Sequence, residues 1–336
     1  MSKVSLSNRD RFNRVLHFQP VDRLPVIEWA GWWHLTLERW HTEGLPEELT
    51  DAFEIRRWFG LDDVQQEWFP VAQPDTPPPP EERKHWVQDM DSYLELRPWL
   101  YPEPPIFDRE QAAAWGAAQR AGELVVWITL NGFFWFPRTL FGIEPHLYAF
   151  SDHPDVMHAM NEDLLAYNLR LVEEYCQYVT PDFLTVAEDM SYNHGPMISE
   201  RLFDEFIGPY YERLLPPLVG RGIVPLVDTD GDISALVPWL RRVGVRGFLP
   251  LERMAGVDVA QLRRDYPDLL LIGAFDKTVM HLGEARMRQE FERLLPVMRT
   301  GGFIPSCDHQ TPPGVSLEDY RLYLRLLREY AEEAAE

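Results

Sequence analysis

The stretch GIVPLVDTDGD, residues Gly222–Asp232, joins an apolar run to three acidic residues spaced by two. The amphipathic segment ISALVPWLRRVG follows the last acid without a gap. An apolar strand, an acidic corner and then a helix is the order in which parallel α/β proteins present polar side chains at the carboxyl end of a strand. The same order recurs at residues 301–309, GGFIPSCDH, so we expect the two corners to form halves of one site.

Strand-like runs alternate with helix-like segments from residue 108 onward. The runs LVVWITL, FLTVA, GFLPLE and LLLIGAF are each followed by a helical pattern, and Leu317–Glu333 forms a closing helix. This alternation predicts βαβ units and a parallel sheet. No G-x-G-x-x-G or GK[ST] pattern follows a strand, so the sequence favours a (β/α)₈ TIM barrel over a dinucleotide-binding open sheet.

The first hundred residues have a different character and predict an elaborated N-terminal region. Residues 1–105 contain the short apolar run Val26–Trp29, interpreted as the first strand, and the segment HWVQDMDSYLELRPW. That segment alternates around Asp89–Ser92, which indicates a hairpin. DDVQQEWF either adds a strand or does not. With no Gly/Ser linker between the regions, we expect residues 1–336 to form a single domain.

Composition excludes several classes of protein. The net charge of −22 leaves no basic stripe for nucleic acid, and no stretch approaches the twenty apolar residues of a membrane span. Two cysteines cannot build a disulfide framework, and the polar N-terminus lacks the apolar core of a signal peptide. We therefore expect a cytoplasmic enzyme with a small-molecule substrate; the oligomeric state stays open.

Nearly every predicted strand delivers an acid or a possible metal ligand to the same edge. Because crowded carboxylates repel each other, some must be protonated, paired with arginine or bound to a cation. Arginines are scarce nearby, so a divalent metal is the simplest solution. The residues at the predicted strand ends are Glu28, Asn131, Glu188, Asp189, Asp228, Asp230, Glu252, Asp276, Cys307, Asp308 and His309.

Four of these residues form the predicted metal site. Asp228 and Asp230 share one face if the strand is still extended there, and His309 with Cys307 comes from the last corner. Two carboxylates and an imidazole suit zinc, manganese, iron or cobalt, and the thiol favours zinc. The alternatives are a turn role for Asp230, a helix cap for Asp232 and a structural role for His309.

The sequence resembles the uroporphyrinogen decarboxylase superfamily, which includes cobalamin-linked methyltransferases. The resemblance rests on RFNRVLHFQPVDRLPV, AEDMSYNHGPMIS followed by FDEFIGPYYERL, LIGAFDKTVMHLG and GGFIPSCDHQTPPGVSLEDYRLYL, in the family's order along the chain. It implies a (β/α)₈ barrel with an elaborated N-terminal part. Aromatic residues in EWAGWWHLTLERW stand where porphyrin decarboxylases look to have arginines, which favours the methyltransferase branch.

That branch carries a zinc site made of His-x-Cys and a final Cys, and the resemblance places Asp228-x-Asp230 and His309 at those positions. It implies a metal-dependent methyltransferase acting with a corrinoid protein. Glu188 or Asp189 would handle the proton. Aromatic side chains and the residues after the acidic corner would bind a small, methoxylated aromatic substrate; alternatively, the aromatic residues are plain core. The predicted substrate-binding residues are Trp29, Trp32, Trp33, Phe134, Tyr192 and His194.

Two other functions stay open at this point. One is a metal-free decarboxylase of the uroporphyrinogen decarboxylase type, in which a carboxylate stabilises a cationic intermediate. The other is a binding or accessory protein on a barrel scaffold, because a fold does not determine function.

Overall fold

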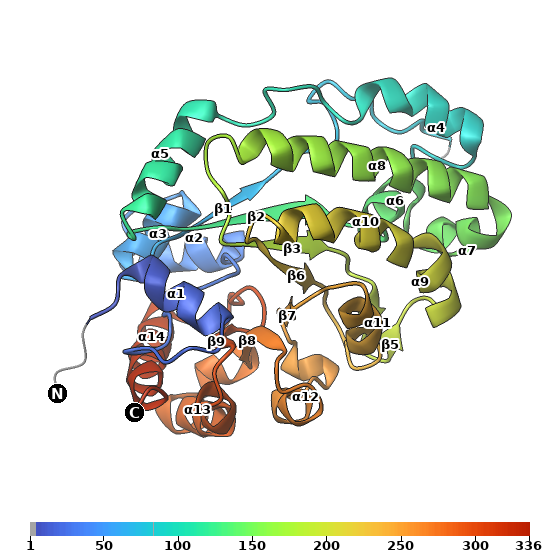
Figure 1. The fold of residues 1–336 in the computed structure, drawn as a ribbon. Coiled ribbons are helices and arrows are strands. Elements are labelled where there is room, and N and C mark those ends of the chain that lie inside the picture. Colours follow the sequence, from blue (N-terminus) through green and yellow to red (C-terminus); the bar gives the residue numbers. More distant parts are fainter. Residues whose placement is uncertain (1–4, 83) are drawn as a thin grey trace.

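A curled, wholly parallel sheet of seven strands forms the centre of the computed structural model, which describes residues 5–82 and 84–336 (Figure 1). The order β1-β2-β3-β6-β7-β8-β9 follows the chain, so each strand pairs with the next in sequence. The strands are β1 Val64–Trp68, β2 Val125–Asn131, β3 Phe183–Ala187, β6 Val224–Asp228, β7 Gly247–Leu249, β8 Leu270–Phe275 and β9 Phe303–Cys307. A small antiparallel pair, β4 Ser191–Tyr192 and β5 Gly195–Pro196, stands apart.

Helices follow the strands and cover the outside of the sheet (Figure 1). They are α1 Asn8–Leu16, α2 His34–Glu43, α3 Ala52–Trp58, α4 Met90–Leu96, α5 Arg109–Arg120, α6 Trp135–Phe141, α7 Ile143–Asp152, α8 Pro154–Tyr175, α9 Glu200–Phe206, α10 Gly208–Val219, α11 Leu236–Arg242, α12 Val259–Asp265, α13 Glu284–Met298 and α14 Leu317–Glu333. Short 3₁₀ helices are η1 Arg97–Trp99, η2 Arg253–Ala255 and η3 Lys277–Leu282.

The central strands are apolar along their whole length because both faces of the sheet are covered. All five residues of β3 and all six of β8 are buried. Parallel sheets buried on two sides have this composition, since no face is left for polar side chains. The predicted α/β class and parallel sheet are therefore confirmed, and DDVQQEWF supplies β1.

The predicted first strand, Val26–Trp29, is not a strand in the structure. Its backbone donors bond to side chains instead of a neighbouring strand: Val26 N–H donates to Asp62 Oδ2 at 2.9 Å, and Trp29 N–H donates to Ser306 Oγ at 3.3 Å. The Val26 carbonyl accepts from Asp62 N–H at 2.9 Å. This irregular segment bonds to residues at both edges of the sheet, and among the described residues no ladder joins β9 to β1. Eight-stranded closure is not confirmed.

The predicted hairpin at residues 85–99 is also wrong, because this segment forms α4 and η1. Asp89 caps α4: its side chain accepts from Ser92 N–H at 2.9 Å, and the Ser92 hydroxyl accepts from Asp89 N–H at 3.0 Å. The four residues interpreted as a turn are a helix start, in which two otherwise unpaired backbone donors are satisfied reciprocally.

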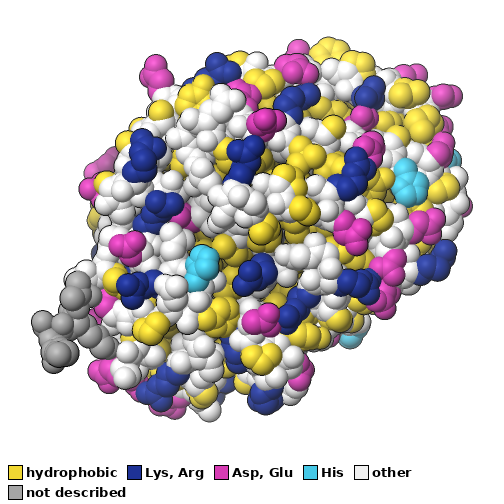
Figure 2. Space-filling model, in the orientation of Figure 1, with side chains coloured by type: hydrophobic (Ala, Val, Ile, Leu, Met, Phe, Trp, Pro, Cys, Tyr) yellow, Lys and Arg dark blue, Asp and Glu magenta, His cyan; other side chains and the backbone are white. Residues whose placement is uncertain are grey.

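None of the helices in residues 5–82 and 84–336 combines the length and hydropathy that a membrane span requires. Acidic and basic side chains are interspersed on the face shown in Figure 2, although the whole chain carries a net charge of −22.

Candidate active site

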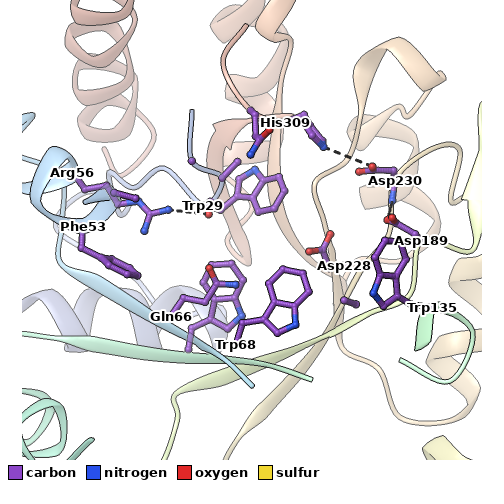
Figure 3. A pocket seen from close by; sticks show the side chains of 16 residues that line it. Trp29, Phe53, Arg56, Gln66, Trp68, Trp135, Asp189, Asp228, Asp230 and His309 are labelled. Carbon is purple, nitrogen blue, oxygen red and sulfur yellow. Dashed lines mark hydrogen bonds and ion pairs between the residues drawn. The ribbon is translucent and has the colours of Figure 1, made fainter. Parts of the chain in front are cut away.

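A cavity of about 540 Å³ opens where several strands of the sheet end (Figure 3). Trp68, Ala187 and Asp228 are the last residues of β1, β3 and β6, and all three line it. This is the edge at which parallel α/β proteins hold their reactive groups. The lining residues are Trp29, Ala30, Gly31, Ala52, Phe53, Arg56, Gln66, Trp68, Trp127, Trp135, Ala187, Asp189, Asp228, Asp230, His309 and Gln310.

The two sides of the cavity differ in chemistry. One side comes from residues 29–68 and is aromatic with a single cation, and Figure 3 shows Phe53 and Arg56 together there. The opposite side gathers acidic residues and one imidazole from the ends of β3, β6 and β9. A ligand that fills this cavity therefore contacts aromatic rings at one end and carboxylates at the other.

Asp228 faces the cavity without a partner. Within the described residues, no donor forms a hydrogen bond or ion pair with its carboxylate. Burial, followed by repulsion from Asp189 and Asp230, raises the pKa of Asp228 well above its ordinary value. This environment therefore favours the protonated form of the carboxyl group unless a cation lies beside it.

Glu188 has the opposite environment. Its carboxylate is fully buried and accepts hydrogen bonds from the N–H groups of Phe133 (3.0 Å), Phe134 (2.8 Å) and Trp135 (3.2 Å), and from the Tyr211 hydroxyl (2.8 Å). The three N–H groups lie at the start of α6, where backbone donors are unpaired, and Tyr211 lies on α10. Burial raises the pKa of Glu188 to about 7, and the four donors oppose the rise. The structure places Glu188 behind the cavity wall.

Asp189, the next residue, does line the cavity. It has a φ of +43°, in a region that few residues other than glycine adopt, which turns its side chain out of the strand direction. Its carboxylate lies 3.3 Å from Arg138 Nη2. Burial and then repulsion from Asp230 raise the pKa of Asp189, and Arg138 opposes this. Of the two predicted proton-handling acids, the structure brings only Asp189 to the cavity.

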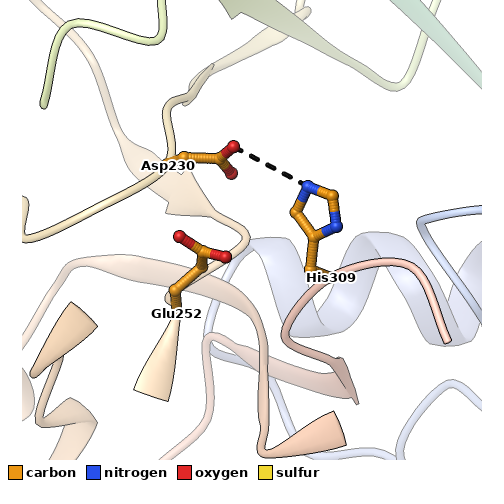
Figure 4. A group of neighbouring side chains, drawn as sticks. All are labelled: Asp230, Glu252 and His309. Atoms are coloured by element: carbon orange, nitrogen blue, oxygen red, sulfur yellow. Dashed lines mark ion pairs between the residues drawn. The ribbon is translucent and has the colours of Figure 1, made fainter. Parts of the chain in front are cut away.

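Asp230, Glu252 and His309 form the group of possible metal ligands in the described part of the chain (Figure 4). One ligand atom from each lies within 4.8 Å of the others. His309 Nε2 is 3.7 Å from Asp230 Oδ2, and this contact raises the pKa of His309, against the effect of burial. Two carboxylate oxygens and an imidazole nitrogen are a donor set that divalent zinc, manganese, iron and cobalt accept, so these residues fit such an ion.

The backbone fixes the position of Glu252. Its Oε2 atom accepts from Gly231 N–H at 3.1 Å, which orients the carboxylate towards Asp230. Gly231 has a φ of +85°, and a Cβ there would lie 2.6 Å from the Tyr192 backbone. Only glycine fits at this corner. In the sequence DTDGD, the possible ligand Asp230 is therefore followed directly by Gly231, whose N–H holds the second possible ligand, Glu252.

The buried carboxylate of Asp308 ties together the loops that carry two of these ligands. It accepts from the backbone N–H groups of Arg253 at 3.0 Å and Lys277 at 3.1 Å, and lies 3.4 Å from Lys277 Nζ. The same Nζ is 3.5 Å from Glu252 Oε1. Asp308 therefore fixes the loops after β7 and β8 beside His309, and Lys277 offsets part of the local negative charge.

Cys307 lies apart from the metal-ligand group. It is fully buried in the hydrophobic core, and burial raises the pKa of its thiol well above the ordinary value. Metal ligation needs the thiolate, which this environment disfavours. Asp228 is also outside the group, although it lines the same cavity. Of the four predicted ligands, the structure brings together Asp230 and His309.

One predicted substrate-binding residue, Trp29, lies at the cavity, with its indole N–H donating to the Cys307 carbonyl at 2.6 Å. Trp32 packs in the core between Trp40 and Tyr320, and Phe134 is fully buried beside His146. The remaining three are exposed and are not among the lining residues: Trp33 immediately precedes α2, while Tyr192 and His194 belong to the small hairpin of β4 and β5.

Several residues of the metal-ligand group and of the cavity lining were not assigned to the site from the sequence. Glu252 follows an apolar run, so the strand-end pattern includes it, but nothing local distinguishes it from Asp276. Arg56 and Phe53 lie on α3, and a helix pattern alone does not reveal which polar residue turns inward. Gln66, Trp68 and Trp127 were also not assigned, whereas Trp135 lies in the aromatic run 133–136 that was expected to contact an aromatic ring.

These observations define an α/β protein of the TIM-barrel type with a carboxylate-rich cavity at the strand ends. The uroporphyrinogen decarboxylase (URO-D) family model matches residues 142–330, more than half of the chain. The protein belongs to this family. None of the curated proteins matches the chain in sequence.

Solved structures show the same fold. A methyltransferase from Methanosarcina mazei superposes with a TM-score of 0.63 at 12% identity, over 97% of this chain and 99% of that one. A putative vitamin-B12 independent methionine synthase from Listeria monocytogenes gives a TM-score of 0.45 at 10% identity, over 94% of this chain and 98% of that one. At these identities the first likeness establishes the fold alone, and the second carries no weight.

Proposed function

We propose that this protein is a metal-dependent methyltransferase that moves a methyl group from a small methoxylated aromatic compound to a corrinoid protein. The observation that supports it best is the Asp230–Glu252–His309 group, placed beside a cavity with aromatic walls. The proposal has three further parts: a corrinoid protein as partner, a single domain over residues 1–336 and a cytoplasmic location. They are supported by the sequence resemblance and the composition.

In the proposed site, Asp230, Glu252 and His309 hold the divalent ion; zinc is the metal that the sequence resemblance implies, and manganese, iron and cobalt also suit this donor set. When bound, such an ion polarises the ether oxygen of the substrate as a Lewis acid. The ligand set is richer in oxygen than the His-x-Cys and Cys set of the methyltransferase branch. Oxygen ligands suit an ether oxygen substrate better than a soft thiol.

The protein's own groups bind the ring and supply the proton. Trp29, Trp68 and Trp135 line the cavity and provide flat surfaces for an aromatic substrate. In the reaction, the bond between methyl carbon and oxygen breaks, the methyl group goes to the corrinoid, and the oxygen keeps the electron pair and takes a proton. Asp228 and Asp189, whose pKa values are raised by burial and by repulsion from neighbouring carboxylates, would give that proton.

Metal content tests the proposal directly. We expect purified wild-type protein to contain about one equivalent of a transition metal by elemental analysis, and His309→Ala and Glu252→Gln to lose it. Cys307→Ala serves as the control, because Cys307 lies outside the group and should keep the metal. Wild-type protein without stoichiometric metal after reconstitution with zinc, manganese, iron or cobalt contradicts the proposal.

A metal-free carboxy-lyase is the second candidate, and the unpaired Asp228 favours it. An acid that lines the cavity without a donor is suited, in its ionised form, to stabilising a cationic intermediate. In that case Asp228→Asn abolishes carbon dioxide release, while His309→Ala and Glu252→Gln leave most of it. Methyl transfer that depends on His309 and Glu252 decides for the first candidate.

A further inference from the structure

Arg56 is a cation on the cavity wall with no anionic partner among the described residues. It lies on α3, its guanidinium carbon is 5.0 Å from the centre of the Phe53 ring, and Nη2 donates to the Trp29 carbonyl at 3.2 Å. Its Nε atom is buried and has no hydrogen-bond partner in the described structure. Figure 3 shows the guanidinium group at the side of the cavity opposite His309.

Nearby arginines are paired, which makes this one unusual. Arg57, the next residue on the helix, lies 3.1 Å from Asp63, and Arg138 lies 3.3 Å from Asp189. A cation withdrawn from water without a partner destabilises a fold, and burial accordingly lowers the pKa of Arg56. An unpaired Arg56 at the cavity wall is explained if a bound ligand supplies the anionic group that pairs with it.

Glu28 does not supply that anion. Its Oε1 accepts from Cys307 N–H at 3.1 Å and from the Ser306 hydroxyl, and its Oε2 accepts from the Tyr320 hydroxyl at 3.1 Å. Burial raises the pKa of Glu28 to about 7, so it is protonated in a large fraction of molecules near neutral pH. The charge of Arg56 is only partly compensated from inside the protein.

We infer that Arg56 binds a carboxylate of the substrate, so that the substrate class is a small aromatic carboxylate. The inference rests on the proposed function in one respect, namely that the methoxy group of the substrate lies at the proposed metal ligands. Because Asp189 and Asp230 lie at the other end of the cavity and repel an anion, the carboxylate is accepted only at the Arg56 end. The opposite end of the ring then faces Asp230, Glu252 and His309.

The geometry and the charge of the protein are consistent with this orientation. A guanidinium group is the side chain that best matches a carboxylate, and within the described residues Nη1 of Arg56 forms no hydrogen bond, while Nη2 forms one, to the Trp29 carbonyl. The cavity of about 540 Å³ lies within the usual range of small-molecule sites, about 300–1,000 Å³. The net charge of −22 repels anions at long range, but salt screens that field within about 8 Å under physiological conditions.

Binding calorimetry with two matched probes, 4-methoxybenzoate and the neutral 4-methoxybenzamide, tests the inference. We expect wild-type protein to bind the acid more tightly than the amide, and Arg56→Gln to weaken acid binding about tenfold to 100-fold, as for a lost charged hydrogen bond. Binding of the amide should stay within about twofold. Arg57→Gln is the control, since it removes the same charge one position away, and Arg56→Lys should retain part of the preference.

The outcomes separate this inference from the proposed reaction. Acid binding that depends on Arg56, in protein without methyl-transfer activity, supports the inference while the proposed function fails. Equal binding of acid and amide, failure of the acid to bind at millimolar concentration, or an unchanged affinity in Arg56→Gln overturns it, even if methyl transfer is observed. If Arg56→Gln does not fold, the acid–amide ratio in wild-type protein and in Arg56→Lys decides.

Discussion

Glu188 and Asp228 occupy almost the same place in neighbouring strands, yet they differ in every interaction. Glu188 follows the last residue of β3, Asp228 ends β6, and the Glu188 N–H donates to the Asp228 carbonyl at 2.9 Å. Glu188 accepts four hydrogen bonds behind the cavity, whereas Asp228 accepts none within the described residues and faces the cavity.

The difference separates two uses of a buried acid. Three donors around Glu188 lie at the start of α6 and the fourth, Tyr211, lies on α10, so this carboxylate connects the end of β3 to both helices. The Asp228 side chain forms no comparable bond. Withdrawing its carboxyl group from water lowers the stability of the fold, and no hydrogen bond offsets this loss. Asp228, which has no hydrogen-bond partner and faces the cavity, is therefore a candidate catalytic residue. Glu188, whose carboxylate is fully hydrogen-bonded, is a candidate structural residue.

Removing the Glu188 side chain should have the largest effect. Glu188→Ala leaves three buried N–H groups and the Tyr211 hydroxyl without an acceptor, at about 1–3 kcal/mol for each unsatisfied group. Because water enters part of the gap, we expect the free energy of unfolding to fall by about 4 kcal/mol in urea titration. Asp228→Ala should cost less than about 1 kcal/mol, and equal losses in the two variants would remove the distinction.

The pH dependence of stability sharpens the comparison further. The pKa of Glu188 is about 7 in the folded protein against an ordinary value of 4.5, so the folded state favours the neutral form. Its contribution is full below pH 4.5 and is lost as pH rises through 7, up to about 3 kcal/mol. Unfolding measured from pH 4.5 to 8 should show a shallower decline in Glu188→Gln than in wild type. Parallel curves would argue against a raised pKa of Glu188. Glu28, whose pKa is also about 7, is present in both proteins, so its contribution cancels in the comparison.

A smaller effect of opposite sign is expected for Asp228→Asn. The amide keeps the shape of the side chain and removes a buried charge next to Asp189 and Asp230. We expect a gain of about 1 kcal/mol in the free energy of unfolding at pH 8, together with loss of activity. A loss of stability would show that Asp228 has a partner, such as a metal ion, in the protein as purified.

The smallest effects should come from the exposed hairpin. Tyr192→Ala and His194→Ala remove side chains that contact each other, with ring centres 5.6 Å apart, and that lie outside the cavity lining. Surface substitutions of this kind change stability by less than about 0.5 kcal/mol. We also expect kcat/KM within about twofold of wild type; a larger loss would restore the sequence-based prediction that these residues bind substrate.

The sheet was predictable because its strands are buried on both faces. FLTVA, LLLIGAF and the closing helix Leu317–Glu333 stand out as continuous apolar or regularly amphipathic runs. Residues 26–29 and 85–99 were mispredicted because their structure depends on side-chain partners, such as Asp62 for Val26 and Ser92 for Asp89. A local pattern does not distinguish such a partner from a strand or a turn.

The candidate site was partly predictable for a related reason. Strand-end position alone brings Asp189, Asp228, Asp230 and His309 to one cavity, although what they do there stays a prediction. It does not distinguish Glu188, whose acceptor role depends on donors from α6. Arg56 was not predictable, since its place at the wall follows from how α3 packs and not from its spacing.

The two sides of the cavity come from different parts of the gene. The proposed metal ligands all lie within residues 142–330, the part matched by the URO-D family model, whereas Trp29, Phe53, Arg56, Gln66 and Trp68 precede it. Under the proposed function, most residues that would choose the substrate and those that would hold the metal therefore lie in different parts of the sequence. A library that varies only residues 29–68 would sample new substrates while leaving the ligand set intact, so this protein is a natural starting point for directed evolution of specificity.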